Sequence, residues 1–317
     1  MSLHTKLVSF LADEVEPSLE RERIKDAHRE VRDMAKEILE DVLINSFVMG
    51  SYKRHTLVRR LDASKKYDVD VMFVLDEKEE LESMLDTMEA VASSIADQID
   101  GIVEYRRQRV SVGLIYDDNF SIDMVPGVAN NDGTYNIFDS RELKPVKTDP
   151  LKHVSIISGL NSKNSDLFIP LIKLVKRWKQ ENASEVLKSF HLEMLAVKIF
   201  ENAEISDLTS ALKKFFNEAH QLTSAHATIN DPVGGHDIAS YLDSTDNPQR
   251  AAAITALNKA SAAMDDAVKH ENDEDDRLAE RAIGRLYSYF KTDADDNTAA
   301  SISSGLAASN APKPWSL

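Results

Sequence analysis

The sequence of 317 residues contains no cysteine. This absence excludes disulfide bonds, zinc sites built on thiolates and cysteine nucleophiles, and it fits a reducing compartment such as the cytoplasm. No apolar run approaches the roughly 18 residues that a membrane-spanning helix needs. The N-terminus also lacks the charged and then apolar layout of a secretory signal. We therefore expect a cytoplasmic protein without a membrane segment.

Basic residues are outnumbered, with 38 Lys and Arg against 54 Asp and Glu, and the formal net charge is -16. Proteins that grip nucleic acid through its phosphates usually show the opposite balance. Any nucleic-acid surface on this chain would have to be a local patch on an acidic body. The overall charge instead favours a protein that handles small anions in one focused site.

Extended patterns are confined to the first half of the chain. Alternation predicts a strand over residues 68–75, with Asp68 and Asp70 on one face and the valines between them on the other. Residues 103–116 and 120–125 are expected to form a hairpin around an Asp-Asp-Asn turn. We expect an irregular stretch after the hairpin, because turn residues gather there.

Helical periodicity frames these strands and fills the second half. Amphipathic helices are predicted over residues 18–44 and 77–99. The loop signal DPVGGHD at 231–237 interrupts the second half, and the small, polar residues 293–317 are expected to form a flexible tail. Four further helices are predicted in the segments IPLIKLVKRWKQ, SFHLEMLAVKIFENA, LTSALKKFFNEAHQL and PQRAAAITALNKASAAMDDAVKH.

This order of elements predicts an α+β fold rather than an alternating βαβ protein. A long N-terminal helix comes first, a mixed strand-and-helix half follows, and an all-helical half comes last. We expect the first unit to span residues 1–155, the helical unit to span 156–292 and the tail to span 293–317.

Asp68 and Asp70 are the first candidates for chemistry. They lie two residues apart on the predicted strand, so both side chains leave the same face. Two carboxylates so close repel each other, and a cation between them relieves that repulsion. Carboxylate oxygens are hard ligands that suit Mg²⁺ or Mn²⁺. A D-x-D pattern alone is nevertheless common, and such aspartates also occur in ordinary turns.

Asp123 lies in the middle of the predicted strand FSIDMVPG, where an aspartate is unfavourable by propensity. If that strand neighbours the strand of Asp68, three carboxylates converge in a set suited to two-metal phosphoryl transfer. Gly50 and Ser51 add a turn whose backbone N–H groups and hydroxyl can bind phosphate. An ordinary strand-to-helix turn and a solvated aspartate are the alternatives.

The segments FVMGS, DVDVMFVL and FSIDMVPG together resemble the polymerase-beta-like nucleotidyltransferase superfamily. Within it, they look most like the bacterial cyclic-oligonucleotide synthases of antiphage systems, the CD-NTases. IPLIKLVKRWKQ followed by LKSFHLEML looks like that family's helix pair that closes over the nucleotide. The resemblance covers roughly residues 18–290 and is specific as a set, whereas each segment alone is unspecific.

The resemblance implies a catalytic nucleotidyltransferase domain with a spine helix, a helical domain over the cleft, and two Mg²⁺ or Mn²⁺ ions. Asp68 and Asp70 would hold both ions, and Asp123 would complete one of them. Gly50 and Ser51 would cradle the β- and γ-phosphates.

The helical half would supply the rest of the nucleotide site by the same resemblance. Lys176 would reach the triphosphate, Ser189 would touch phosphate and Phe190 would stack on a base. A Lys is a compact cation for phosphate, and an aromatic face supports any base. Lys176 is also compatible with a solvated helix charge, as are its neighbours Lys173, Arg177 and Lys179, and Phe190 with a plain core aromatic.

The implied activity is synthesis of an adenine-containing cyclic di- or trinucleotide from ATP and other nucleoside triphosphates, in bacterial antiphage defence. Two alternatives remain open: a transferase that modifies a tRNA end, a small molecule or a protein hydroxyl, and a non-enzymatic protein on a degenerate fold. Without cysteine, no zinc thumb for DNA binding is expected. The resemblance also implies control by a regulatory protein or by conjugation at the C-terminus, for which the tail ending in Trp315-Ser316-Leu317 is suited.

Overall fold

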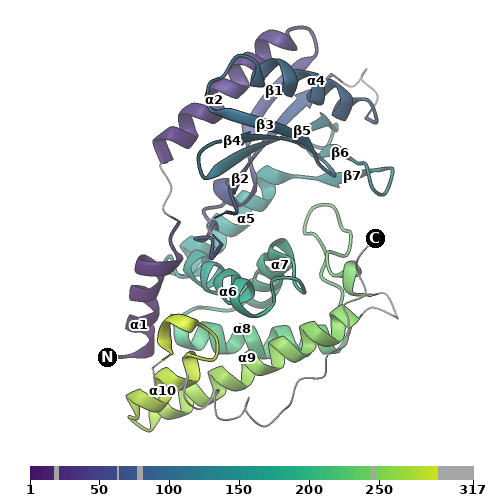
Figure 1. Cartoon of the computed structure of the whole chain (residues 1–317). Coiled ribbons are helices and arrows are strands. Elements are labelled where there is room, and N and C mark those ends of the chain that lie inside the picture. Colours follow the sequence, from purple (N-terminus) through teal and green to yellow (C-terminus); the bar gives the residue numbers. More distant parts are fainter. Residues whose placement is uncertain (18–20, 63, 77–80, 244–247, 292–317) are drawn as a thin grey trace, which may run out of the picture.

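The computed structural model divides into a sheet lobe and a helical lobe, which lie one above the other in Figure 1. This arrangement confirms the predicted α+β fold with a long helix near the N-terminus. The tail predicted for residues 293–317 lies outside the described residues. The structure describes residues 1–17, 21–62, 64–76, 81–243 and 248–291.

Seven strands form one mixed sheet in the order β1-β2-β5-β4-β3, and β6 joins β5 to β7. β2 and β5 run parallel, and the other pairs are antiparallel. The strands are β1 (Leu43–Val48), β2 (Tyr67–Leu75), β3 (Ile102–Arg107), β4 (Val112–Tyr116), β5 (Phe120–Ala129), β6 (Tyr135–Asp139) and β7 (Lys144–Thr148).

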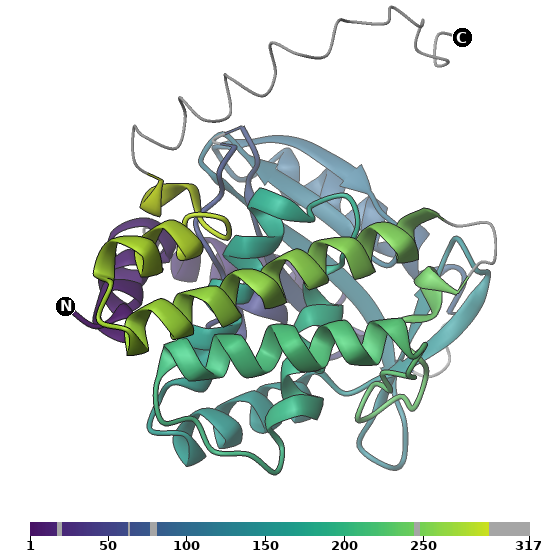
Figure 2. The same ribbon diagram turned by 90° about the horizontal axis from the view of Figure 1, so that it is seen from below.

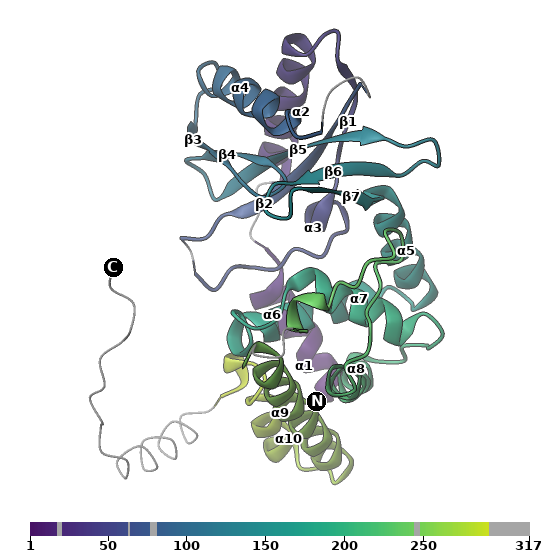
Figure 3. The ribbon, with the colours of Figure 1, turned by 90° about the vertical axis from the view of Figure 1, so that its right-hand side faces the viewer.

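Two helices cover one face of this sheet, α2 (Arg21–Ile38) and α4 (Met84–Ala96) (Figure 3). The apolar residues of β2 alternate as predicted: Val69 and Val71 pack into the core beneath these helices. Met72 and Val74 lie on the opposite face, in a small separate cluster. That second face is turned toward the helical lobe, so the even-numbered aspartates of β2 share the side on which the two lobes meet.

The helical lobe has its own hydrophobic core, which includes residues from both ends of the described chain. Helix α1 (Leu3–Phe10) and the π-helical turn Leu11–Val15 pack there, although α2 belongs to the sheet lobe. Figure 2 shows the antiparallel pair α8 and α9. The sheet lobe also contains the short helix α3 (Gly50–Lys53), and the helical lobe contains α5 (Pro150–Lys163), α6 (Phe168–Asn182), α7 (Ser189–Phe200), α8 (Leu208–Ser224), α9 (Pro248–Asn272) and α10 (Asp276–Ile283). The unit boundaries expected from the sequence stay a prediction.

Several predicted bounds were wrong, and sheet pairing explains each difference. The helix predicted to reach residue 44 ends at Ile38, because Leu43–Val48 pair with β2 instead. The single strand predicted over 103–116 is two strands, β3 and β4, joined where the Gln108 N–H donates to the Ser111 carbonyl at 2.8 Å. The stretch expected to be irregular after Gly127 contains the end of β5 together with β6 and β7.

The strands β6 and β7 escaped prediction because they lie outside the main order of the sheet. β7 pairs only with β6, and it contains two lysines and a proline, the composition of a protected edge strand. Such a strand shows little apolar alternation, so its sequence resembles a loop. In the described part of the chain, no helix is long and apolar enough to cross a membrane.

Candidate active site

The three predicted aspartates lie on the two parallel strands at the centre of the sheet. β2 and β5 pair in a register that sets Asp70 directly opposite Asp123 and Asp68 opposite Ser121. Because side chains alternate along a strand, all three carboxylates leave the face that is turned toward the helical lobe. The condition that the sequence left open, neighbouring strands, is thus met.

Burial and mutual repulsion disfavour the charged forms of two of these carboxylates. Burial, followed by the charge of Asp68, raises the pKa of Asp70 to about 6. Burial, followed by the charges of Asp70 and Asp68, raises the pKa of Asp123 to about 7. A group of acids that resists ionisation in this way gains stability when a cation neutralises it.

Neighbouring side chains engage some of the carboxylate oxygens. Arg60 lies 3.1 Å from Asp68 Oδ2, and the Ser121 hydroxyl donates to Asp68 Oδ1 at 3.2 Å. Gln108 Nε2 donates to Asp123 Oδ1 at 2.9 Å. Within the described ranges, no three acidic or histidine side chains already form a metal-holding cluster. The donor set itself, hard oxygens on adjacent strands, fits divalent Mg²⁺ or Mn²⁺.

The Gly50-Ser51 turn lies against Asp70. Gly50 has φ +69°, and a Cβ at this position would lie only 1.8 Å from Asp70 Oδ2. The position therefore requires glycine both for its backbone conformation and for its lack of a side chain. The Met49 N–H donates to the Asp70 carbonyl at 2.8 Å, which fixes the start of the turn beside the strand.

A cavity of about 340 Å³ opens between this turn and the helical lobe. Seven of the eight predicted site residues line it, and Asp123, which pairs with Asp70 on the neighbouring strand, does not. The seven come from both lobes: Gly50, Ser51, Asp68, Asp70, Lys176, Ser189 and Phe190. The structure thus brings the predicted phosphate-binding and base-binding residues to one place beside the carboxylates.

Lys176 and Phe190 have partners that sequence reasoning missed. Lys176 Nζ donates to Glu193 Oε1 at 2.9 Å, and burial lowers the pKa of this lysine. The Arg54 guanidinium lies 5.5 Å from the centroid of the Phe190 ring, within cation–π range. Both partners, Glu193 and Arg54, line the same cavity. Glu193 was recognisable as a lone charge in the apolar run HLEMLAV, and Arg54 was hidden in a generally basic segment.

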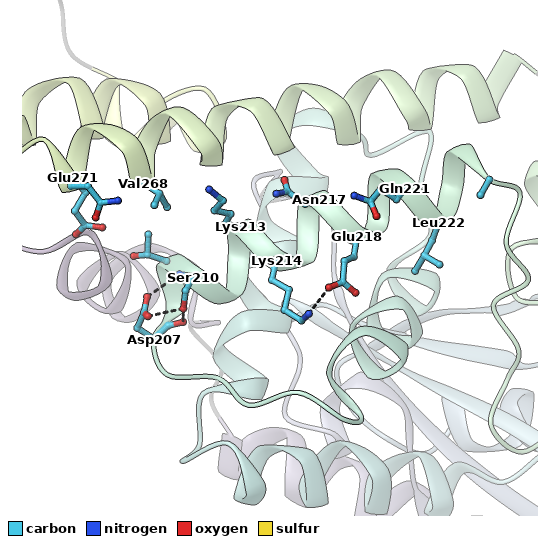
Figure 4. Close-up of a pocket in the computed structure, with 13 residues that line it drawn as sticks. Asp207, Ser210, Lys213, Lys214, Asn217, Glu218, Gln221, Leu222, Val268 and Glu271 are labelled. Atoms are coloured by element: carbon cyan, nitrogen blue, oxygen red, sulfur yellow. Dashed lines mark hydrogen bonds and ion pairs between the residues drawn. The ribbon is translucent and has the colours of Figure 1, made fainter.

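A larger hollow, of about 840 Å³, lies at a different place, between α8 and α9 (Figure 4). Many of its lining residues are polar and pair with one another: Lys214 pairs with Glu218, and Asp207 accepts hydrogen bonds from Ser210. None of the three aspartates lines it. Size alone would select this hollow, but Asp68 and Asp70 line the smaller cavity.

The part of the chain that carries the three aspartates and the glycine turn matches a known protein family. Residues 1–161 match the Second Messenger Oligonucleotide or Dinucleotide Synthetase domain. The chain belongs to this family. This membership confirms the resemblance to the CD-NTases, a family of nucleotidyltransferases, that was inferred from the sequence.

Three relatives illustrate the likeness. A cyclic AMP-AMP-AMP synthase of Acinetobacter is 29% identical over 206 residues, which cover 62% of this chain and 59% of that protein. The match therefore spans less than two thirds of this curated relative. The structure of E. coli CdnC with ATP superimposes with a TM-score of 0.73 at 19% identity, over 91% of this chain and 99% of that one. Another structure of CdnC is a complex with HORMA-deltaN.

The third relative is the cyclic AMP-GMP synthase DncV of Vibrio cholerae, solved with the linear intermediate pppA(3′,5′)pG. It has a TM-score of 0.67 at 12% identity and covers 90% of this chain and 94% of its own. At identities this low, the TM-scores of 0.73 and 0.67 establish a shared fold. The shared fold spans both lobes, since about nine tenths of the chain is covered in each case.

Proposed function

We propose that this chain makes a cyclic di- or trinucleotide from nucleoside triphosphates. The observation that carries the proposal is the register of β2 and β5, which sets Asp70 opposite Asp123 beside a cavity lined by Gly50 and Lys176. Family membership supports the same reaction class. Two of the relatives named above, the Acinetobacter and Vibrio cholerae proteins, are synthases of cyclic nucleotides, so transfer to a tRNA, a drug or a protein is not favoured.

In the proposed reaction, a ribose hydroxyl oxygen attacks the α-phosphorus of a bound triphosphate. A new P–O bond forms, the bond to the β-phosphate breaks, and pyrophosphate leaves. Two bound Mg²⁺ or Mn²⁺ ions would supply charge neutralisation for the attacking and leaving oxygens. Asp68, Asp70 and Asp123 would hold these ions.

The chain's own residues bind and orient the donor nucleotide. Gly50 and Ser51 would hold the β- and γ-phosphates, because the missing side chain of Gly50 leaves room beside Asp70. Lys176 and Ser189 would meet the triphosphate from the helical lobe, and Phe190 would support the base. The proton of the attacking hydroxyl is released to solvent as the new P–O bond forms. A second transfer within the linear product would close the ring.

We further propose an adenine-containing product and a role in antiphage defence. An Acinetobacter relative makes a cyclic triadenylate, and E. coli CdnC was solved with ATP. The complex of CdnC with HORMA-deltaN supports a regulatory protein partner for this chain. Conjugation at the C-terminus is the second proposed route of control.

The test is incubation of the full chain with all four nucleoside triphosphates and Mg²⁺ or Mn²⁺, without any acceptor. A product that resists phosphatase and has the mass of a cyclic oligonucleotide is expected. Asp70→Asn should abolish this product, because the variant loses a charged ligand while keeping the side-chain shape. Label transferred only to an added RNA, small molecule or protein would contradict the proposal.

A further inference from the structure

A single buried carboxylate joins the two lobes at the edge of the nucleotide cavity. Glu193 on α7 is only 1% exposed. Its Oε1 accepts hydrogen bonds from Lys176 Nζ and from Thr56 Oγ1, both at 2.9 Å. Its Oε2 accepts from Arg54 Nε at 2.8 Å. Lys176 belongs to the helical lobe, whereas Arg54 and Thr56 belong to the segment that follows the glycine turn.

This carboxylate is ionised despite its burial. Burial opposes the charge, but Lys176 and Arg54 outweigh burial and lower the pKa of Glu193 to about 2. A buried charge is costly to a fold unless it is fully paired. Such a pair is weak evidence for a purely stabilising role, since apolar side chains of similar volume often stabilise as well or better. Its geometry is therefore more informative than its energy.

Arg54 and Thr56 also close the phosphate turn with their backbones. The Arg54 N–H donates to the Gly50 carbonyl at 3.1 Å, and the Thr56 N–H donates to the Ser51 carbonyl at 3.0 Å. The two residues that fix the turn through their N–H groups are thus the two whose side chains Glu193 holds. Through them the carboxylate has a two-point attachment to the Gly50-Ser51 turn.

We infer that Glu193 is a positioning residue: it fixes the Gly50-Ser51 turn and Lys176 in one arrangement across the two lobes. This inference rests on the proposed function. A triphosphate site assembled from two lobes needs a common anchor, because a displacement of about 1 Å can cost on the order of 100-fold in rate. Glu193 provides that anchor without itself needing to touch the nucleotide.

Neutralising Glu193 should affect nucleotide binding and turnover in different ways. Glu193 is an anion that competes with a triphosphate for the cations Arg54 and Lys176. Neutralising it leaves more positive charge at the cavity, so nucleotide affinity should hold or increase. The same change releases the turn, so turnover should fall. A residue that merely stabilises the fold would not move the two quantities in opposite directions.

The test is Glu193→Gln in the full chain. We expect kcat to fall by about tenfold or more, while the Kd for a non-hydrolysable ATP analogue stays unchanged or decreases. Hydrogen exchange at residues 49–57 should accelerate, and exchange in α8 and α9 should stay as in the wild type. Thr56→Val should lower kcat in the same direction by less, and it should add little in the Glu193→Gln background.

The matched control is Glu181→Gln, which neutralises another shielded glutamate of the helical lobe. Glu181 pairs with Arg177 at 2.8 Å and does not line the nucleotide cavity. Its variant should keep the wild-type kcat. A wild-type kcat in Glu193→Gln would overturn the inference, as would a loss of turnover that matches the loss of ATP-analogue binding. If the wild type itself makes no product, the proposed function fails, and hydrogen exchange at residues 49–57 still decides the positioning role.

Discussion

Two requirements on Asp70 conflict. A metal site needs its carboxylate charged, whereas its neighbours disfavour that charge. The folded protein raises the pKa of Asp70 to about 6 and that of Asp123 to about 7, above the unfolded value near 3.8. Between these values the folded state binds more protons than the unfolded state. The metal-free protein therefore loses stability as the pH rises from about 4 to about 7.

Asp70→Asn removes this penalty at alkaline pH. In EDTA at pH 8 we expect the variant to melt about 1–2 °C higher than the wild type, which corresponds to roughly 1 kcal/mol in a chain of this size. At pH 4 the two should melt alike. Mg²⁺ should raise the melting temperature of the wild type and have little effect on the variant. Thermal melts in a matrix of pH and metal measure all three; a variant less stable than the wild type at pH 8 would contradict the site's electrostatics.

Gly50 can be tested against a glycine in a similar backbone conformation. Gly50→Ala places a Cβ 1.8 Å from Asp70 Oδ2, so we expect transfer activity to fall by about 100-fold or more. Gly133 has φ +82° but no heavy atom within 4 Å of an added Cβ. Gly133→Ala should therefore show only the backbone cost and keep wild-type turnover. Equal activity loss in both variants would mean that backbone strain, and not the contact with Asp70, explains the effect.

Strand β4 supports the third aspartate at the scale of an element. Gly113 on β4 pairs with Asp123 on β5, and an added Cβ would lie 2.8 Å from Asp123 Oδ1 and 2.7 Å from Gln108 Nε2. Gly113→Ala should displace Asp123 or its hydrogen bond to Gln108, and we expect kcat to fall about tenfold with nucleotide Kd unchanged. Turnover by rapid quench and binding by calorimetry give the two values. Unchanged turnover would show that Asp123 has room to move.

The sequence predicted the face of a strand on which a side chain lies better than it predicted which residues of different elements meet. Alternation along residues 68–75 gave the correct face for Asp68 and Asp70, because a period of two is a local property. The pairing of Asp70 with Asp123 was only conditional, because these residues lie 53 positions apart and parallel pairing has no local signature. The Glu193 cluster was out of reach for the same reason. Its four members come from three parts of the chain, α6, α7 and the segment after the glycine turn, and this segment meets the two helices only when the lobes dock.

At the scale of the whole molecule, the proposed control by a regulator depends on the C-terminal tail. Residues 293–317 lie outside the described residues, and their composition alone motivates the hypothesis that they act as a handle for a regulator. Deleting them should leave basal synthesis from nucleoside triphosphates unchanged and remove any dependence on a protein partner. The measurement is product formed with and without the partner, and a truncated chain that loses basal synthesis would contradict the hypothesis.

The N-terminal helix gives the molecule an order of assembly. The Leu3 N–H donates to Glu271 Oε1 at 2.7 Å, and the Phe10 ring lies 5.0 Å from that of Tyr287, so the contacts of α1 are completed only by residues more than 260 positions later in the chain. The sheet lobe with its three aspartates is translated between them. A chain that ends before α9 therefore contains all three aspartates but lacks the contacts that α1 makes with the end of the helical lobe.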